Sequence, residues 1–393
     1  MHKAHLTATF TQDKKNYLLS YSSNDTKDSI ALSLPNTQKI YLWEYEFPPF
    51  LESFLPEGYL YEIFKNLLTK EYGYIDDYLI FSLLADSIDS RVNFKSTHQS
   101  LKFDSIDLDE ILNNDTDDTF SFLVDKFLTK NAIGGVQPKS IAIIKDKDKL
   151  NLKEVIVKTW GDEFANLAEN EYFCLKACEY ANIPIPKIHL SQNKNFLVVE
   201  KFIYKESEIL GFEEVASLMN KGKNKKYSGS YEQIAKVIYP FLSDKKTSMI
   251  NYYKTVVMNY LLKNGDAHLK NFGLLFRDDF SQIWLSPSYD IVSSVVYIFK
   301  DKPALNMFGK KVWYSKKELI EFGVKSCLLS KSEATRYYNE CFEAKEQIKL
   351  DIKSYITTNP SFNKIGNRMV DILELDDTKT IKELDSELIR SWS

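Results

Sequence analysis

The sequence contains little glycine and proline, with 13 and 11 of these residues among 393. Collagen-like and proline-rich disordered chains need far more of both, so those two classes of protein are excluded. The sequence contains neither G-x-G-x-x-G nor G-x-x-x-x-G-K-S/T, so both glycine-rich nucleotide motifs are absent. The remaining composition, 44% hydrophobic and 27% charged, is that of an ordinary globular protein.

Cysteine and long apolar runs are scarce as well, and the chain has no net positive charge. The four cysteines form no C-x-x-C pair, and we expect buried free thiols at Cys174, Cys178, Cys327 and Cys341. A net charge of −4 disfavours a chain that binds nucleic acid by itself, because phosphate neutralisation supplies most non-specific affinity. The N-terminal residues carry no uninterrupted apolar stretch and no window approaches a membrane span, so we expect a cytoplasmic protein that does not engage membranes.

The first hundred residues predict a small β region followed by two helices. Residues 1 to about 45 alternate in short apolar runs separated by polar turns, which is typical of strands. Apolar residues then recur every three or four positions between Pro56 and Gly73, which predicts an amphipathic helix. A second helix, with an acidic first turn, is predicted over residues 76–88. The acidic, turn-rich segment 104–118 indicates a solvated connector.

The length of the chain indicates two or three structural units. Beyond the connector, a mixed unit of strand, strand, helix and strand is predicted over residues 140–145, 154–160, 166–184 and 196–202. From about residue 212 onward the pattern is mostly helical, apart from one β-hairpin. We therefore expect an α+β protein with a mixed β/α N-terminal part and a mostly helical C-terminal part.

The hairpin joins residue types that bind metal and phosphate. Asp266 and Asn271 stand in the spacing D-x-x-x-x-N of kinase catalytic loops, where the aspartate accepts a hydroxyl proton and the asparagine binds magnesium. The hairpin returns Asp290 beside Asn271, and an amide with one carboxylate suits a magnesium ion that also holds phosphate oxygens. Lys270 is a candidate for steadying the γ-phosphate. His268 could act chemically, although a structural role that orients the loop is an equal alternative.

The hypothesis depends on other residues, because D-x-x-x-x-N alone is common and N-G-D is ordinary turn chemistry. Lys158 ends a β-branched strand, the position from which a kinase lysine neutralises nucleotide phosphates and pairs with a helix glutamate. The following helix offers both Glu169 and Glu171, and the spacing does not choose between them. Glu200 and Phe202 end a buried strand, where backbone groups could hydrogen-bond an adenine. The order of these features along the chain is the observation that carries the hypothesis.

Taken in this order, the residues resemble the HipA family of toxin-like serine/threonine kinases from bacterial toxin–antitoxin operons. The similar segments are FLPEG (54–58), GGVQPK (134–139), NEYFCLKACEYANIPIP (170–186), VVEKF (198–202), NGDAHLKNFGLLF (264–276) and SYDIVSS (288–294). The resemblance implies a bilobal, protein-kinase-like fold. The implied N-terminal subdomain, N-lobe with hinge and helical C-lobe cover residues 1–105, 106–203 and 204–393.

The resemblance also implies roles for individual residues. It makes Asp266 the catalytic base and makes Asn271 and Asp290 the magnesium ligands. The implied ATP contacts are Lys158 with the phosphates, Glu200 and Phe202 with the adenine, and a loop near the γ-phosphate formed by Gly134, Gly135, Val136, Gln137 and Lys139.

The implied activity is transfer of phosphate from ATP to a serine or threonine of a protein substrate. In the best-known members that protein is an aminoacyl-tRNA synthetase, and its phosphorylation arrests growth. The implied partner is a HipB-like helix-turn-helix antitoxin that binds both the kinase and operator DNA. The chain would then contact DNA only indirectly, through the antitoxin.

Two departures from the family pattern stand out. Members often carry one or two serines before the glycine loop, and autophosphorylation there silences the enzyme; Ala132 and Gly134 occupy those places here, which puts this route in question. A Gly-Ala turn usually ends the N-terminal subdomain, whereas this chain has DSIDSRVNF at 86–94. Two alternatives stay open: a catalytically silent, kinase-shaped binding module or corepressor, and a small-molecule phosphotransferase.

Overall fold

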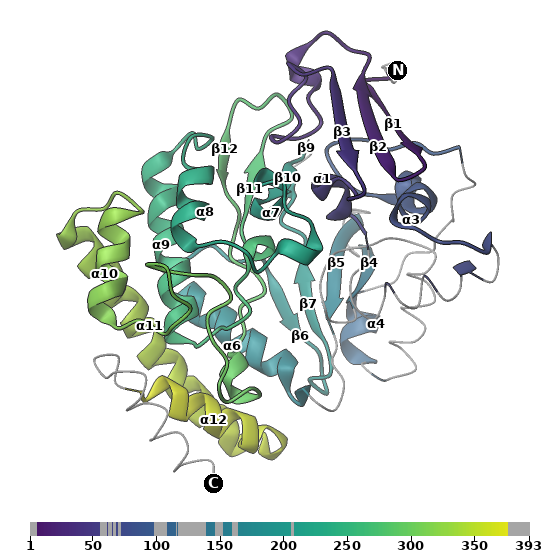
Figure 1. The fold of residues 1–393 in the computed structure, drawn as a ribbon. Helices are drawn as coiled ribbons and strands as arrows, with labels where there is room; N and C mark the ends of the chain where they lie inside the picture. Colours follow the sequence, from purple (N-terminus) through teal and green to yellow (C-terminus); the bar gives the residue numbers. More distant parts are fainter. Residues whose placement is uncertain are drawn as a thin grey trace.

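The computed structural model describes most of the chain, which is drawn in Figure 1. The described residues are 6–55, 61, 65, 68–69, 72–97, 108–114, 116, 139–145, 152–158, 164–205 and 208–375. For residues 139–145 and 152–154 the description covers the backbone.

The N-terminal part contains a three-stranded antiparallel sheet, which confirms the predicted β region. Its strands, in order across the sheet, are β1 (Ala8–Asp13), β2 (Asn16–Tyr21) and β3 (Ile40–Glu44). Tyr17, Leu19 and Tyr21 alternate along β2 and are buried, because successive side chains of a strand point to opposite faces. The apolar run 29–35 is not a strand, since it forms bends in which Leu32 and Ser33 donate their backbone N–H groups to a carboxylate oxygen of Glu213 (2.7 and 3.1 Å).

The helices of the N-terminal part begin at residues that suit a helix start. α1 (Pro49–Glu52) is a single turn with proline at its first position. α3 (Asp77–Leu84) is the helix predicted over 76–88, and Asp76 caps it by accepting the N–H of Leu79 (2.9 Å). The helix predicted between Pro56 and Gly73 lies largely outside the described residues, and those described there are helical: Tyr61, Lys65, Leu68, Thr69 and Tyr72.

The acidic segment predicted as a solvated connector contains a helix that packs on the protein. α4 (Leu108–Asn113) buries the side chain of Ile111 completely. Ile111 contacts a cluster formed by Val155, Val157, Phe196 and Val198 of the central sheet. The prediction of a connector is therefore wrong for this stretch, because Leu108, Ile111 and Leu112 together dock the short helix although acids surround them.

A four-stranded antiparallel sheet forms the centre of the protein. Its strands, in order across the sheet, are β4 (Lys139–Lys145), β5 (Leu152–Lys158), β7 (Leu197–Glu200) and β6 (Ile188–Leu190). Three of these strands and the helix α6 (Leu167–Tyr180) confirm the predicted mixed unit, whereas β6 has only three residues and was not predicted.

The two faces of this sheet are covered by different helices. Val155 and Val157 face α4, whereas Ile156 of the same strand packs into the core that contains α6. Because side chains alternate along a strand, Lys158 lies on the face of Ile156 and points toward α6. The end of β5 thus places the lysine beside the helix that carries the candidate glutamates.

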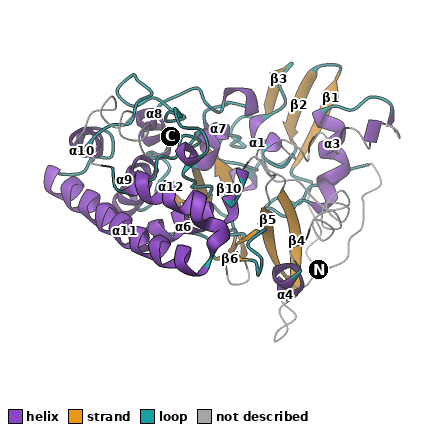
Figure 2. Cartoon of the chain, turned by 90° about the horizontal axis from the view of Figure 1, so that it is seen from below, coloured by secondary structure: helices purple, strands orange, loops and turns teal. Residues whose placement is uncertain are grey.

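The C-terminal part is mostly helical, as predicted. Its helices are α7 (Val215–Leu218), α8 (Tyr231–Ile238), α9 (Lys245–Leu261), α10 (Lys316–Lys325), α11 (Lys331–Thr358) and α12 (Asn363–Leu373). α9 is buried almost all around, and Figure 2 shows that α11 and α12 lie with α6 and α9 on one side of the molecule, away from β1 to β3. A ribbon of β8 (Tyr204–Lys205) and β9 (Glu208–Ile209) precedes this part.

A second three-stranded sheet carries the predicted hairpin. Its strands, in order, are β10 (Gly211–Glu214), β11 (Gly273–Phe276) and β12 (Ile283–Leu285), all antiparallel. β11 and β12 confirm the predicted hairpin. β10 was not predicted, because its four residues include a glycine and two glutamates, which are depleted in strands.

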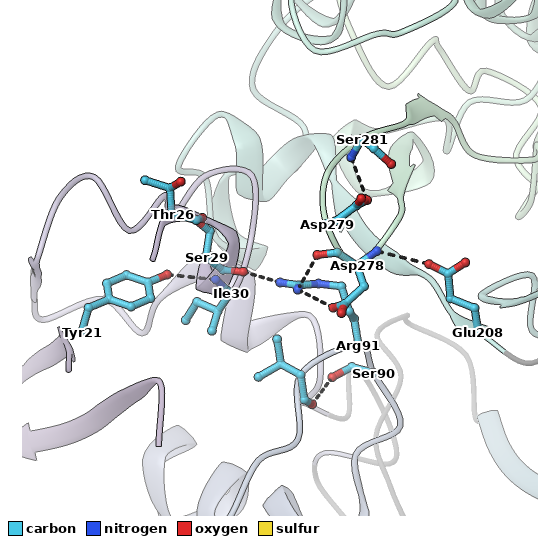
Figure 3. A network of polar contacts seen from close by, with 11 residues as sticks. Tyr21, Thr26, Ser29, Ile30, Ser90, Arg91, Glu208, Asp278, Asp279 and Ser281 are labelled. Carbon is cyan, nitrogen blue, oxygen red and sulfur yellow. Dashed lines mark hydrogen bonds and ion pairs between the residues drawn. The ribbon is translucent and has the colours of Figure 1, made fainter. Parts of the chain in front are cut away.

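Arg91 joins the N-terminal part to the turn of this hairpin (Figure 3). Its guanidinium donates to the backbone oxygen of Ser29 and to both the backbone oxygen (3.2 Å) and Oδ1 (2.9 Å) of Asp278. The same group lies over the rings of Phe276 (5.5 Å) and Phe280 (4.7 Å), which stack on each other. Arg91 belongs to the segment DSIDSRVNF (86–94), so this segment forms a specific contact with the hairpin.

The cysteines confirm one expectation from the sequence. Cys174, Cys178, Cys327 and Cys341 are all buried free thiols, as predicted. Among the helices that the structure describes, none combines the length and the apolarity needed to cross a bilayer.

Candidate active site

The hairpin brings Asn271 and Asp290 together at its open end. β11 and β12 pair in the register Leu274 with Leu285 and Phe276 with Ile283, so the residues that flank the two strands become neighbours. Nδ2 of Asn271 donates to Oδ2 of Asp290 over 3.3 Å. The predicted juxtaposition is confirmed, while the role of both residues as metal ligands remains a prediction.

Lys158 reaches the same point from the central sheet. Its ammonium group forms ion pairs with Glu171 of α6 and with Oδ1 of Asp290, and the side chain is only 4% exposed. Burial lowers the pKa of Lys158, but the charges of Asp290 and Glu171 outweigh burial and raise that pKa above its ordinary value. The lysine therefore stays charged, as a group that binds phosphate must.

The structure settles which glutamate pairs with the lysine. Glu171 faces Lys158, whereas Glu169 accepts hydrogen bonds from Asn166 (2.6 Å) and from the hydroxyl of Tyr355 (3.2 Å). Two positions along a helix rotate a side chain by about 200°, so the two glutamates of α6 face opposite ways. Sequence spacing alone could not fix which of them faces the sheet.

Asp290 is held in an unusual backbone conformation. Its φ is +54°, in the left-handed region that costs a non-glycine residue about 1–2 kcal/mol. Aspartate tolerates this region better than most residues, because its short polar side chain can hydrogen-bond locally. The segment that follows is fixed by Asn170 of α6, whose side chain donates to the backbone oxygen of Ser293 (3.1 Å) and accepts its N–H (2.8 Å).

Asn264 connects the catalytic loop to the segment of Asp290. Its Oδ1 accepts the N–H of Asp266 (3.0 Å), and its Nδ2 donates to Oδ1 of Asn259 (2.7 Å) and to the backbone oxygen of Asp290 (3.5 Å). One buried amide therefore fixes the candidate base and the candidate metal ligand relative to each other.

The carboxylate of Asp266 lies at the rim of the site and accepts a hydrogen bond from the hydroxyl of Tyr227 at Oδ1 (2.7 Å). Burial raises the pKa of Asp266 above its ordinary value, and the charges of Asp290 and Asp301 add to this rise. The Tyr227 hydrogen bond and the charge of Lys226 oppose the rise. A carboxylate with a raised pKa suits a general base better than an ordinary aspartate does.

Gly265 is required by close packing rather than by an unusual φ. Its N–H donates to Oγ of Ser294 (2.7 Å), and a Cβ at this position would lie 2.1 Å from Oδ2 of Asp301 and 2.8 Å from the backbone oxygen of Lys302. The loop that carries Asp266 can therefore keep its course only with glycine at this place.

We expect Gly265→Ala to lower the free energy of unfolding by about 1–3 kcal/mol, because a methyl group cannot fit without displacing backbone. Urea denaturation measures this loss. The double variant Gly265→Ala with Asp301→Ala should recover part of it, since the closest clash is removed. Equal urea midpoints for Gly265→Ala and the unmodified chain would contradict the packing argument.

Lys270 lies in a short 3-10 helix (Leu269–Asn271) that follows Asp266. His268 is the residue that caps the start of this helix. The ammonium group of Lys270 is buried and pairs with Glu214 (3.6 Å). The N–H of His268 donates to Oδ1 of Asn271 (2.9 Å), and its buried ring packs edge-on against Tyr227 (5.1 Å between centroids). These contacts support the structural alternative for His268, in which it orients the loop.

The strand β7 brings Glu200 and Phe202 toward the same site. The N–H of Glu200 donates to the backbone oxygen of Lys187 (2.8 Å), so this N–H is already used within the protein. The ring of Phe202 packs on Tyr289 (5.5 Å), the residue before Asp290. Tyr289 in turn donates its hydroxyl to the backbone oxygen of Lys270 (2.7 Å).

The predicted glycine loop lies mostly outside the described residues, including Gly134, Gly135, Val136 and Gln137. Its last residue, Lys139, begins β4 and is paired in register with Lys158 of β5. The sequence of the loop therefore continues into β4 at Lys139, the position that pairs with Lys158.

Three residues of the site were missed by the sequence reasoning. In the sequence, Asn264 looks like an ordinary turn residue. The signal that could have identified it is its position two residues before Asp266. Tyr227 lies in the lysine-rich segment 220–230, which the pattern indicated only as an exposed loop; Lys226 of that segment is 7% exposed. Asn170 occupies a helix position with no distinguishing signal in the sequence.

The donors at the open end of the hairpin fit magnesium. The carboxylate of Asp290 and the amide oxygen of Asn271 are hard ligands, and a carbonyl oxygen has a second lone pair beside the one that accepts from His268. In the part of the chain that the structure describes, no three His, Cys, Asp or Glu residues form a metal cluster. A metal here would complete its ligands with water and phosphate oxygens, as is usual for magnesium.

Known proteins are similar to this chain in sequence and in fold. The family model described as HipA-like C-terminal domain matches residues 131–348, more than half of the chain. A solved structure of the Shewanella oneidensis MR-1 toxin–antitoxin system, with HipA, HipB and operator DNA, is similar with a TM-score of 0.66. It is 15% identical and the match covers 94% of this chain and 96% of that one, so the two share a fold. The kinase-like α+β fold expected from the sequence is thereby confirmed.

Two curated relatives match shorter stretches. A Haemophilus influenzae protein named "Putative kinase" is 31% identical over 185 residues, which cover 42% of this chain and 53% of the relative. A Sinorhizobium fredii protein named "Putative kinase Y4dM" is 25% identical over 226 residues, which cover 51% and 54%. The chain spans about half the length of these curated relatives.

Proposed function

The chain belongs to the HipA family, and from this premise we propose that it is an ATP- and magnesium-dependent serine/threonine protein kinase of HipA toxin type. The observation that carries the proposal is the meeting of Lys158, Asn271 and Asp290 at one point, beside the loop of Asp266. A lysine, an amide and a carboxylate in this arrangement match what phosphoryl transfer requires of a protein, which is positioning and charge neutralisation.

Each candidate residue has a definite task in this proposal. Asp266 accepts the proton of the acceptor hydroxyl as the hydroxyl oxygen bonds to the γ-phosphorus of ATP and the bond from that phosphorus to the departing ADP breaks. Lys158 holds the nucleotide phosphates, for which it must leave Asp290 while Glu171 continues to orient it. Magnesium, when bound by Asn271 and Asp290, supplies further neutralisation of phosphate charge.

The remaining candidates complete the nucleotide site. Lys270 exchanges Glu214 for the γ-phosphate. Backbone atoms of Glu200 and Phe202 hydrogen-bond the edge of the adenine. Gly134, Gly135, Val136, Gln137 and Lys139 cover the γ-phosphate as the predicted loop.

The proposed biological role follows that of the family. The acceptor is a serine or threonine of a protein, with an aminoacyl-tRNA synthetase as one candidate, and the phosphorylation arrests growth in the cytoplasm. The similar Shewanella oneidensis assembly contains HipB and operator DNA, which supports a HipB-like helix-turn-helix antitoxin as partner of this chain. DNA would be contacted through that antitoxin.

Incubation of the purified chain with bacterial lysate and ATP labelled on the γ-phosphate tests the proposal. We expect label on serine or threonine of a lysate protein, and we expect chelation of magnesium to prevent it. Label confined to small molecules would instead identify a metabolite phosphotransferase.

A parallel thermal-unfolding assay separates a kinase from a silent binding module. ATP with magnesium at about 100 times its dissociation constant should stabilise the folded chain by about 2.7 kcal/mol. If neither label transfer nor stabilisation occurred, the binding module would be the better description.

A further inference from the structure

The segment 221–228, here called the lysine loop, places a tyrosine directly on the candidate base. The hydroxyl of Tyr227 donates to Oδ1 of Asp266 over 2.7 Å. The ring of Tyr227 packs edge-on against His268 of the catalytic loop, and the ammonium group of Lys226 lies 5.2 Å from the ring centroid. The tyrosine is thus fixed on three sides although 43% of it is exposed.

The lysine loop is bound to the catalytic loop by its backbone. The N–H of Leu269 donates to the backbone oxygen of Lys226 (3.1 Å), and Nζ of Lys311 donates to the backbone oxygen of Tyr227 (3.1 Å). Lys221 also donates to the backbone oxygen of Ser228, which closes the loop. The position of Tyr227 relative to Asp266 is therefore set by backbone contacts as well as by the hydroxyl.

The other side of the lysine loop is held by the N-terminal part. Oε2 of the buried Glu52, in α1, accepts the N–H of Lys223 (2.6 Å). The ammonium group of Lys223 pairs with Asp77 of α3 (3.2 Å). The pair between Lys225 and Glu46 (2.7 Å) is exposed and adds little. Glu52 and Asp77 are the less exposed of the polar contacts that connect the first hundred residues to the loop.

We propose that Tyr227 is a positioning residue for the catalytic base, and that Glu52 of the N-terminal part holds the lysine loop in the place where Tyr227 can act. The inference rests on the proposed function, because it assigns a task to a contact of Asp266. A hydrogen bond at Oδ1 fixes the rotation of the carboxylate and leaves Oδ2 for the acceptor hydroxyl. The N-terminal part would then contribute to catalysis without touching the substrate.

The charges around Asp266 give this task a measurable signature. The groups that act on its carboxylate are Tyr227, Lys226, Asp290 and Asp301. Of these, the hydroxyl of Tyr227 is the hydrogen-bond donor that lowers the pKa of Asp266, against a burial that raises it. Removing the hydroxyl should raise this pKa further. Because the base works in its ionised form, the activity would then appear at higher pH.

The experiment compares Tyr227→Phe with the unmodified chain by the pH dependence of kcat and by the KM for ATP. Tyr74→Phe is the matched control, since it removes the same hydroxyl from a tyrosine that is 77% exposed on the N-terminal part. At neutral pH we expect kcat of Tyr227→Phe to fall about tenfold, the factor for losing a hydrogen bond to a charged group. We expect the acidic limb of its pH profile to move upward, the KM for ATP to change less than about twofold, and thermal unfolding to stay at the temperature of the control.

A second variant tests the part played by the N-terminal residues. Glu52→Ala should move the acidic limb in the same direction by a smaller amount, because the loop loses one anchor while Tyr227 keeps its hydroxyl. An unmoved profile in Glu52→Ala would overturn the role of the N-terminal part.

The outcomes of the test distinguish a failure of the proposed function from a failure of the positioning role of Tyr227. If the unmodified chain transfers no phosphate, the proposed function fails. If it does, and Tyr227→Phe matches Tyr74→Phe in kcat and pH profile, the positioning role is wrong. Phosphate mapped onto Tyr227 itself would make that residue an acceptor and would also overturn the inference.

Discussion

Replacing Asp266 with alanine should abolish phosphate transfer while the protein stays folded. A positioned general base contributes about 10²- to 10⁴-fold to a reaction rate, so we expect a loss of at least about 100-fold. The carboxylate is bonded to the hydroxyl of Tyr227 at the rim of the site and is not part of the hydrophobic core. Its removal should therefore leave the unfolding temperature nearly unchanged. Label transfer from ATP measures the rate.

The matched control for this variant is Asp279→Ala, which removes a carboxylate that is exposed in the turn of the same hairpin. ATP with magnesium should still stabilise the Asp266→Ala protein, because the nucleotide contacts belong to other residues. Label incorporation by Asp266→Ala at the rate of Asp279→Ala would show that another group is the base.

Replacing Asp290 with asparagine should remove the magnesium dependence together with the activity. Asparagine keeps the shape of the side chain and tolerates the left-handed backbone at this position, so the change isolates the charge. Without the carboxylate, the neighbouring amide of Asn271 cannot form an anionic site, and we expect phosphate transfer to fall at least about 100-fold. Titration of magnesium against label transfer and against thermal stabilisation by ATP measures both effects.

In this variant Lys158 keeps its ion pair with Glu171, so binding of ATP without metal should be retained. Asp279→Asn serves as the control for loss of one charge from the hairpin. Magnesium titrations that superimpose for Asp290→Asn and the control would exclude Asp290 as the ligand.

The elements with a clear signal in the sequence could be predicted, and the others could not. α6 has helical periodicity and the hairpin of β11 and β12 has two apolar runs around a polar turn, and both are present. β6 and β10 lack such a signal, because β6 follows closely on Pro184 and Pro186 and β10 contains a glycine and two glutamates, which are depleted in strands. The run 29–35 has strand-like alternation but is used for docking onto Glu213, a contact that only the tertiary structure reveals.

The candidate site divides in the same way. Asp266, Lys270 and Asn271 are close in sequence, so their spacing alone carried information. Lys158 could be proposed because it ends a strand, but its choice of Glu171 depends on how α6 is rotated against β5. The contribution of Tyr227 depends on a loop that is about 40 residues away in sequence and has no periodicity. Contacts of this kind follow from packing between elements, which a single sequence does not specify.

The stacking of Arg91 on the hairpin bears on how this protein can be shortened. Phe276 and Phe280 form part of the strand and turn that lead from Asn271 to Asp290, and the guanidinium from the first hundred residues covers their rings. A truncated chain without those residues would present two uncovered aromatic faces to water, next to the segment that aligns the metal ligands. Such a fragment would tend to self-associate, and its hairpin would align Asn271 and Asp290 less well. Inactivity of the fragment would therefore say nothing about the chemistry of the whole chain.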